Sequence, residues 1–292
     1  MSPPESSQAS AHGAARAVTA GARGAASGHA ERRALLATCV AAAVRGADVI
    51  RGFARQRGTL EWEEKAHSDF VTAVDRASEA AIGDVVAARH ADARLVGEEL
   101  TPEAGALGGG GLSFVADPLD GTTNYLHDFP WYAVSIAALL DGALAAGVVL
   151  NVPTGELFTA TSGGGARRNG QPIAVSKVDT PRRALIGTGF PFKRTEEIEP
   201  YVRVMAAVMR EVAGLRRPGS AALDLADVAC GRFDAFWELT LAPWDVAAGI
   251  LLVREAGGVA TDLAGAPARV AQGPIVAGNP AMHRWLLEQL RP

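Results

Sequence analysis

The sequence predicts a layered α/β or α+β fold, in which helices pack on β-sheets. Three observations support this prediction. Segments with helical and with strand periodicity alternate along the chain, β-hairpin patterns fill its middle, and 48% of the 292 residues are hydrophobic, which is enough for a substantial core. No internal repeat or linker is visible in residues 31–292, so we expect this range to form a single unit.

The first thirty residues differ from the rest of the chain. They are rich in Ala, Gly and Ser and contain few large apolar side chains. Such a segment buries too little surface to offset the entropy lost on ordering, and it lacks the apolar stretch of a secretory signal. Residues 1–30 are therefore expected to be a disordered extension, or the product of a misassigned start codon.

A long helix is expected from Glu31 to about Arg55, because Leu36, Val40 and Val44 recur at a spacing of four. The next expected elements are a helix from Thr72 or Asp75 to about His90, a strand at Leu95–Val96, a Gly-rich loop over 105–112 and a strand at Ser113–Ala116.

Two dipeptides, Asp141-Gly142 and Asn169-Gly170, predict hairpin turns. Asp141-Gly142 also interrupts the most apolar stretch, Trp131 to Leu150, so no membrane span is expected. The strands expected around the turns are Ser135–Leu140, Ala143–Val152, Glu156–Thr161 and Ile173–Val175. The later elements are expected to be a strand at Ala184–Thr188, helices at Pro200–Leu215 and Ser220–Cys230, a strand at Phe233–Leu239, a helix from Trp244-Asp245 to Gly257-Gly258, and a final helix at Ala281–Leu290 with Asn279 as N-cap and Pro280 at N1.

Charge and cysteine content exclude several classes of function. The net charge is −4 and the pI about 5.9, so the chain has no basic surplus to neutralise the phosphates of a nucleic acid. The two cysteines, Cys39 and Cys230, supply neither a disulfide framework nor zinc-ligand spacing. We expect both to be buried thiols in a reducing cytoplasm.

Acidic residues stand near the ends of the expected elements. Glu98 and Asp117 each follow a short apolar strand, and Asp120 lies three positions after Asp117. Asp75 and Asp245 stand at expected helix starts. Carboxylates in such places can meet in one crevice, and hard divalent cations bind oxygen ligands. Because no histidine accompanies the set, the pattern favours magnesium or manganese over zinc.

The residues beside Asp120 suggest a place for a phosphate group. Leu119 would offer its backbone carbonyl to a metal, while Gly121 permits close approach and Thr122 adds a hydroxyl and an N–H. Together these features predict metal-assisted hydrolysis of a phosphate ester, with metals roughly 3.5–4 Å apart activating a water and stabilising the leaving oxygen. Taken singly, each residue also fits an ordinary turn or helix cap.

Several segments resemble the inositol monophosphatase family, in the family's order, over about residues 65 to 258. The segments are Ser68–Asp75, Gly97-Glu98-Glu99, Phe114–Tyr125, Arg216–Ala226, Phe236-Trp237-Glu238 and Pro243–Gly249. Agreement of several independent motifs makes this a specific signal. The Arg216–Ala226 and Phe236–Glu238 segments look like the bacterial branch of the family. The resemblance implies a five-layered αβαβα sandwich of the inositol monophosphatase and fructose-1,6-bisphosphatase type.

The resemblance also implies roles for single residues. Two to three Mg²⁺ ions per subunit are implied: Glu98, Asp117 and the Leu119 carbonyl would hold the first, Asp117, Asp120 and Asp245 the second, and Glu98 a weaker third. Asp75 with Thr122 would orient or deprotonate the nucleophilic water, with Glu98 as a further catalytic residue. The N–H groups of Gly121 and Thr122 would bind phosphate. The remaining substrate contacts implied are Gly219, Ser220, Ala221, Glu238 and Asp245.

The implied function is hydrolysis of myo-inositol monophosphate to inositol and phosphate by a lithium-sensitive, cytoplasmic homodimer. Two alternatives stay open. Relatives cleave histidinol phosphate, fructose 1,6-bisphosphate or 3′-phosphoadenosine 5′-phosphate by the same chemistry. Some bacterial relatives also act as protein partners in transcription and ribosomal RNA maturation, which would imply association with RNA polymerase.

Overall fold

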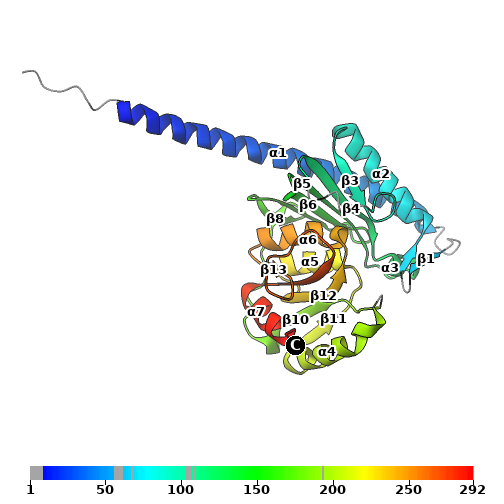
Figure 1. Ribbon diagram of the computed structural model, residues 1–292. Coiled ribbons are helices and arrows are strands. Elements are labelled where there is room, and N and C mark those ends of the chain that lie inside the picture. The colour runs from blue at the N-terminus through cyan, green and yellow to red at the C-terminus, as the bar shows by residue number, and fades with distance from the viewer. Residues whose placement is uncertain are drawn as a thin grey trace, which may run out of the picture.

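The computed structural model describes residues 9–55, 62–66, 69–102, 107, 109–192 and 194–291, with side chains 9–27, 64–66 and 69–71 outside this description. Two main β-sheets alternate with three layers of helices, as Figure 1 shows. Helices α1 and α2 cover one face of the larger sheet, α5 and α6 lie between the sheets, and α4 and α7 cover the far side of the smaller sheet. The predicted layered α/β class is thereby confirmed.

The larger sheet has seven strands in the order β3-β4-β5-β6-β7-β8-β9, and only the β3–β4 pair among them is parallel. Its strands are β3 (Arg94–Gly97), β4 (Leu112–Asp120), β5 (Ala133–Leu140), β6 (Ala143–Asn151), β7 (Leu157–Thr161), β8 (Gly165–Arg168) and β9 (Gln171–Pro172).

The smaller sheet has five strands in the order β11-β10-β12-β14-β13. Its strands are β10 (Leu185–Thr188), β11 (Gly214–Arg216), β12 (Ala235–Leu241), β13 (Val259–Thr261) and β14 (Gly273–Gly278), and a separate hairpin joins β1 (Glu63–Ala66) to β2 (Asp69–Val71).

The α-helices are α1 (Ala9–Phe53), α2 (Ala73–Arg89), α3 (Thr122–Leu126), α4 (Ile198–Glu211), α5 (Ala221–Ala229), α6 (Pro243–Glu255) and α7 (Pro280–Gln289). Among the described helices, none is both long and apolar enough to cross a membrane.

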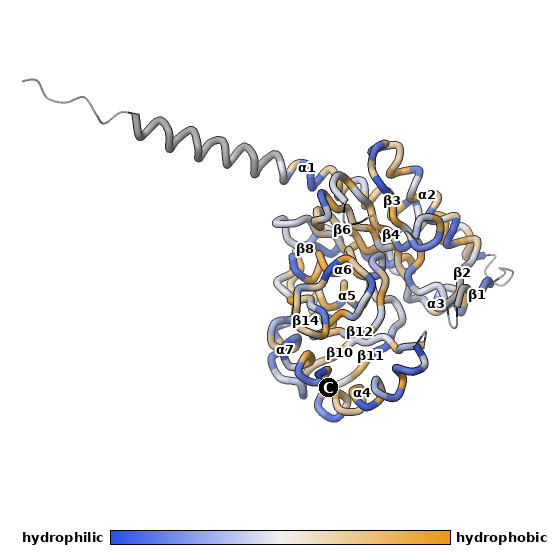
Figure 2. The backbone as a smooth tube through the Cα atoms, viewed as in Figure 1, coloured by the Kyte–Doolittle hydropathy of each residue, from blue (hydrophilic) through white to orange (hydrophobic). Residues whose placement is uncertain are grey.

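Alternation along the central strands buries both faces of the larger sheet. Phe114 and Ala116 of β4 point into the core beneath α1 and α2, whereas Val115 points into the core shared with α5 and α6. Successive side chains of a strand point to opposite faces, so a strand covered on both sides is apolar throughout. Figure 2 shows this as strongly hydrophobic strands inside a rim of hydrophilic helix surfaces and loops.

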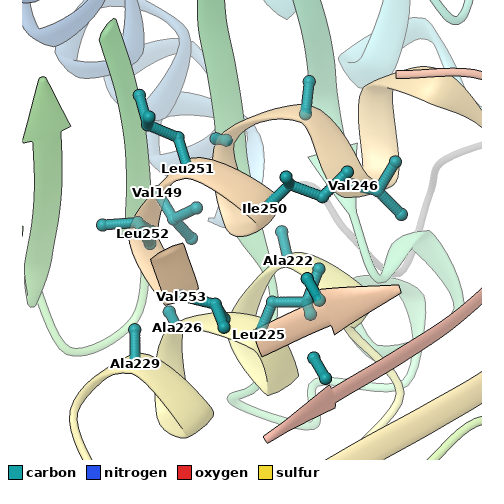
Figure 3. Close-up of a cluster of buried hydrophobic side chains, with 14 of the residues drawn as sticks. Val149, Ala222, Leu225, Ala226, Ala229, Val246, Ile250, Leu251, Leu252 and Val253 are labelled. Atoms are coloured by element: carbon teal, nitrogen blue, oxygen red, sulfur yellow. The ribbon is translucent and has the colours of Figure 1, made fainter. Parts of the chain in front are cut away.

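The middle layer is packed from small and aliphatic side chains. Figure 3 shows side chains of α5 and α6 directed toward one another beside Val149 of β6. Close approach depends on glycine here, because a Cβ at Gly249 would overlap Leu225 and one at Gly147 would lie 3.2 Å from Cα of Ala248. Burial of a leucine such as Leu225 stabilises the fold by about 1.5–3 kcal/mol. This layer fixes α6, and with it the helix end that carries Asp245.

Most predicted elements are found near their expected bounds. The Asp141-Gly142 hairpin joins β5 to β6, with positive φ at both turn residues. Asn279 caps α7, and its Oδ1 accepts hydrogen bonds from the N–H groups of Ala281 and Met282. The Gly-rich loop predicted over 105–112 lies partly outside the described residues, at positions 105, 106 and 108.

Two element predictions are wrong. Ile173–Val175 is not a strand, because the N–H of Val175 donates to Ala256 and draws the chain away toward the end of α6. The helix predicted over Pro200–Leu215 stops at Glu211, since the N–H groups of residues 213 and 214 bond to the Ala184 carbonyl and lead into β11.

The bounds of the first helix also differ from the prediction. Helix α1 begins at Ala9, whereas the sequence predicted a start at Glu31. The expected disorder of residues 1–30 stays a prediction, because residues 1–8 and the side chains before Gly28 are outside the described part.

Candidate active site

The first turn of α2 brings Asp75 to Thr122. Thr72 is the N-cap of the helix, and its N–H and hydroxyl both donate to Oδ2 of Asp75, at 2.9 and 2.6 Å. The other oxygen, Oδ1, accepts a hydrogen bond of 2.9 Å from the Thr122 hydroxyl. Burial raises the pKa of Asp75 above its ordinary value, and these hydrogen bonds oppose part of that increase. Asp75 therefore caps the helix with Oδ2 and contacts Thr122, its predicted catalytic partner, with Oδ1.

A bulge in β4 brings Asp117 and Asp120 to the same cavity. Asp117 pairs with Ser135 and Asp120 with Ala133, so the register shifts between them. In a regular strand, side chains three positions apart point to opposite faces, but the extra residue of a bulge reverses this relation. The N–H of Leu119 donates to Oδ1 of Asp117 at 2.9 Å and stabilises the bulge.

Asp120 is fixed by the start of α5. Its Oδ2 accepts hydrogen bonds from the Ser220 hydroxyl at 2.6 Å and from the N–H of Ala222 at 2.8 Å. Burial raises the pKa of Asp120, whereas the Ser220 and Ala222 hydrogen bonds and the charge of Arg217 lower it. The carboxylate on β4 is thus held in place by a helix about a hundred residues later in the chain.

Gly121 connects β4 to α3 with a φ of +99°. L-residues with a Cβ rarely adopt this conformation. A Cβ here would also lie 3.1 Å from the carbonyl oxygen of Trp131 and 3.3 Å from that of Gly219. The turn therefore requires glycine. It places the Thr122 hydroxyl, which has one proton to donate, 2.9 Å from Oδ1 of Asp75 and 3.1 Å from the Leu119 carbonyl oxygen.

Asp245 is the third residue of α6, and its Oδ2 accepts a hydrogen bond of 2.7 Å from the N–H of Ala242. Pro243 occupies the first turn, where a missing N–H costs no helical hydrogen bond. An acid at this position therefore stabilises the start of the helix by accepting a backbone hydrogen bond. Asp245 also lines the cavity, where its carboxylate could bind a metal ion.

A cavity of 420 Å³ gathers the predicted site residues from four segments of the chain. Those that line it are Glu98, Asp117, Leu119, Asp120, Gly121, Thr122, Gly219, Ser220, Ala221, Glu238 and Asp245. Asp75 does not line the cavity, and its contact with it runs through the Thr122 hydroxyl.

The charges of these carboxylates act on one another. Burial raises the pKa of Asp117 well above its ordinary value. The negative charges of Glu98, Asp120 and Asp245 raise it further, and the N–H of Leu119 lowers it. A divalent cation with oxygen ligands would remove this repulsion, so the chemistry of the donor set fits Mg²⁺.

The donors are not already drawn together around one point. Within the described residues, no three side chains of His, Cys, Asp or Glu are grouped so that they could hold an ion as they stand. One oxygen of each of Asp117, Asp120 and Asp245 accepts a hydrogen bond from a backbone N–H group. The metal-ligand roles therefore stay predictions.

Sequence reasoning did not find one wall of the cavity. Phe190 and Phe192 line it, and the guanidinium of Arg217 lies 5.5 and 5.1 Å from their ring centroids. Asp224 lies on the same cavity and is buried, and its Oδ1 has no hydrogen-bond partner among the described residues. Arg217 and Asp224 lie inside a segment that carries the family resemblance, but no sequence pattern indicated which groups they contact.

Comparisons with known proteins find similarity over most of the chain. The model of the inositol monophosphatase family matches residues 31–292. The Nus factor SuhB of Pseudomonas aeruginosa is 43% identical over 231 residues, which are 78% of this chain and 85% of that protein. The inositol-1-monophosphatase of Rhizobium meliloti is 41% identical over 261 residues, or 89% and 97% of the two chains. The crystal structure of the extragenic suppressor protein SuhB from Bartonella henselae aligns with a TM-score of 0.82 at 37% identity, covering 88% and 98%.

Proposed function

The chain belongs to the inositol monophosphatase family, and from this premise we propose that it is a magnesium-dependent phosphomonoesterase acting on myo-inositol monophosphate. The observation that carries the proposal is the convergence, on one 420 Å³ cavity, of carboxylates from β4, α6 and the loop after β3 with the Thr122 hydroxyl. The Rhizobium relative, which is named an inositol-1-monophosphatase, supports the choice of substrate.

Five groups would hold the magnesium ions: the carboxylates of Glu98, Asp117, Asp120 and Asp245 and the carbonyl of Leu119. When bound, Mg²⁺ supplies positive charge that makes water a better nucleophile and stabilises negative charge on the leaving oxygen. Such a charge would offset the repulsion that Glu98, Asp120 and Asp245 exert on the buried carboxylate of Asp117.

Asp75 and Thr122 supply the proton acceptor. Because the Thr122 hydroxyl donates to Asp75, its oxygen can accept a hydrogen bond from a water in the cavity. As that water attacks phosphorus, its proton passes to Thr122 Oγ1 and the Thr122 proton passes to Asp75 Oδ1. The phosphorus–oxygen ester bond breaks, and the alcohol oxygen takes a proton from solvent. The raised pKa of the buried Asp75 suits a general base.

Different groups of the cavity would bind the phosphate and the alcohol of the substrate. The N–H groups of Gly121 and Thr122, in the turn where Gly121 has a positive φ, would bind phosphate. Glu238, with Gly219, Ser220 and Ala221, would contact the hydroxyl groups of the alcohol. Glu238 fills the space where a Cβ of Gly189 would stand.

A phosphate-release panel with purified full-length protein tests the proposal. Its substrates are myo-inositol monophosphate, histidinol phosphate, fructose 1,6-bisphosphate and 3′-phosphoadenosine 5′-phosphate, each with a magnesium titration and a lithium control. We expect fastest release from the inositol ester, with lithium inhibition that magnesium relieves. If the protein does not hydrolyse the inositol ester but rapidly hydrolyses another ester of the panel, the substrate assignment is overturned. The proposed metal-assisted hydrolysis would then still hold.

A second candidate function rests on the name of the Pseudomonas relative, a Nus factor. We propose it as an additional role, association with RNA polymerase, in a cytoplasmic homodimer. A pull-down at low salt with tagged full-length protein tests it, with an Asp117→Asn variant alongside to separate binding from catalysis. Retention of polymerase by both proteins is expected, and an empty pull-down would remove the proposal.

A further inference from the structure

Glu79 is a buried carboxylate that belongs to none of the family-like motifs. It lies on α2, four positions and about one helical turn after Asp75, and only 1% of its surface is exposed. A carboxylate in such a place is costly unless hydrogen bonds compensate for its burial. Among the described residues, the groups that donate hydrogen bonds to it come from one short turn, the segment that follows β3.

Both oxygens of Glu79 are used by that turn. Oε2 accepts a hydrogen bond of 2.6 Å from the N–H of Glu99, and Oε1 accepts one of 2.9 Å from the N–H of Leu100. The Thr101 hydroxyl also donates to Oε1, at 3.2 Å. Hydrogen bonds to an ionised acceptor are roughly twice as strong as neutral ones. The two N–H groups immediately after Glu98 are thus tied to helix α2.

The turn is closed around this carboxylate. The N–H of Gly97 donates to both the carbonyl and the hydroxyl oxygen of Thr101, at 3.2 and 2.9 Å. A Cβ at Gly97 would overlap the carboxylate of Glu79, so glycine is needed for the two segments to approach. Glu98 stands between Gly97 and Glu99, and its position is fixed on both sides by contacts that lead to Glu79.

The same face of α2 contacts two other parts of the cavity. The Ser78 hydroxyl donates to the carbonyl of Pro118 at 3.0 Å, beside Asp117, and Asp75 accepts from Thr122 at 2.9 Å. Helix α2 therefore contacts two segments of the cavity wall, the one that runs from Asp117 to Thr122 and the one that carries Glu98. Glu79 is its contact with the second segment.

We propose that Glu79 is a positioning residue that holds Glu98 in place for magnesium, so that its carboxylate is required for full magnesium affinity. The proposal rests on the proposed function, because it takes Glu98 as a ligand. Glu79 lies outside the cavity lining and would not touch the ion.

The test compares Glu79→Gln, Glu98→Gln and a matched control in the full chain. In Glu79→Gln, one of the two oxygens becomes an NH₂ group that faces an N–H donor, so the turn loses a hydrogen bond while the side-chain volume is kept. The control is Glu255→Gln, because Glu255 likewise accepts from two loop N–H groups, those of Gly163 and Gly165 at 2.8 and 2.9 Å. Magnesium binding is measured by titration calorimetry.

We expect Glu79→Gln to weaken magnesium binding by about 10- to 100-fold, as is typical for residues behind metal ligands. Glu255→Gln should bind as the wild type does. The KM for magnesium should rise more than the kcat at saturating magnesium falls. Hydrogen exchange at the amides of Glu99 and Leu100 should become faster in Glu79→Gln alone.

The outcomes separate the two proposals. Wild-type affinity in Glu98→Gln, or no binding by the wild type, would sink the metal site itself. If Glu98→Gln binds magnesium more weakly while a folded Glu79→Gln binds it with wild-type affinity, the proposed role of Glu79 is overturned. If Glu79→Gln does not fold, Thr101→Val decides, because it removes the hydroxyl that contacts both Glu79 and Gly97: weaker magnesium binding supports the proposal, and unchanged binding contradicts it.

Discussion

The Thr122 hydroxyl donates a hydrogen bond of 2.9 Å to Oδ1 of Asp75, although the two residues are 47 positions apart. Oδ2 of the same carboxylate is occupied by the N–H and hydroxyl of Thr72. The helix cap therefore fixes the direction in which Asp75 presents its second oxygen. This geometry gives a buried acid access to the cavity through one hydroxyl group.

Removal of that hydroxyl should stop proton transfer without unfolding the protein. Thr122→Val keeps the shape of the side chain, so we expect turnover to fall by about 100-fold or more, the range of general-base catalysis. Thr122→Ser should restore most of the activity. Steady-state kinetics of both variants check this prediction. Near-wild-type turnover in Thr122→Val would show that Asp75 does not act through Thr122.

Asp120→Asn should lower turnover by orders of magnitude while the fold survives. The variant loses the charge of a proposed magnesium ligand, but its amide oxygen can still accept from the Ser220 hydroxyl and the Ala222 N–H, which share Oδ2 in the native protein. Circular dichroism melting should therefore change little. Activity close to that of the wild type would contradict the assignment of Asp120 as a metal ligand.

Substitution at Gly189 should affect the alcohol more than the phosphate. A Cβ at Gly189 would overlap the carboxylate of Glu238, so Gly189→Ala is expected to displace that side chain. We predict a higher KM for myo-inositol monophosphate and a smaller change for an ester without hydroxyl groups next to the phosphate. Glu238→Gln should show the same selectivity. Equal effects on both esters would argue against Glu238 as a substrate contact.

Asp227 should make the stability of the protein depend on pH. Burial raises its pKa from 3.8 to about 6, against the opposing effect of Arg232. Between these values the folded state keeps a proton that the unfolded state has lost, so stability falls as pH rises, by on the order of 3 kcal/mol at about 1.4 kcal/mol per pKa unit.

The measurement is denaturant unfolding at pH 4 and pH 6.5, each compared with Asp227→Asn. The variant has no titrating group at this position and can still accept from Arg232, whose Nη1 lies 3.0 Å from Oδ1 of Asp227. Its stability should fall less between the two pH values than that of the wild type. The difference between the proteins isolates Asp227 from the other buried carboxylates. An identical slope for both would contradict the prediction.

Motifs and periodicity predicted much of the fold and the cavity. The Asp141-Gly142 turn, the Asn279 cap and the strand before Asp117 are local features, and local sequence determines them. The acidic residues and the Leu119–Thr122 segment of the candidate site were predicted from residue type and spacing. Gly219, Ser220, Ala221 and Glu238 were implied only by the family resemblance. Eleven of the twelve predicted residues line the cavity, and the twelfth, Asp75, contacts it through Thr122.

What the sequence missed depends on contacts between distant segments. The burial of the Glu79 carboxylate is compensated by backbone N–H groups about twenty residues later. Every residue except proline has a backbone N–H, so the residue types do not reveal this contact. The end of α4 at Glu211 is set by hydrogen bonds to Ala184, while its own periodicity continues. The bulge in β4, which brings Asp117 and Asp120 to the same cavity, is visible only from the pairing of β4 with β5. None of these relations is a property of one segment.

The most direct test of the central claim is phosphate release from myo-inositol monophosphate as magnesium is titrated into metal-free protein, with Asp117→Asn measured in parallel. Burial and the charges of Glu98, Asp120 and Asp245 raise the pKa of Asp117, so a bound cation would stabilise its ionised carboxylate. The wild type should be inactive in EDTA and gain activity with magnesium, and the variant should stay inactive throughout. Metal-independent release by the wild type, or full activity of Asp117→Asn, would contradict the account.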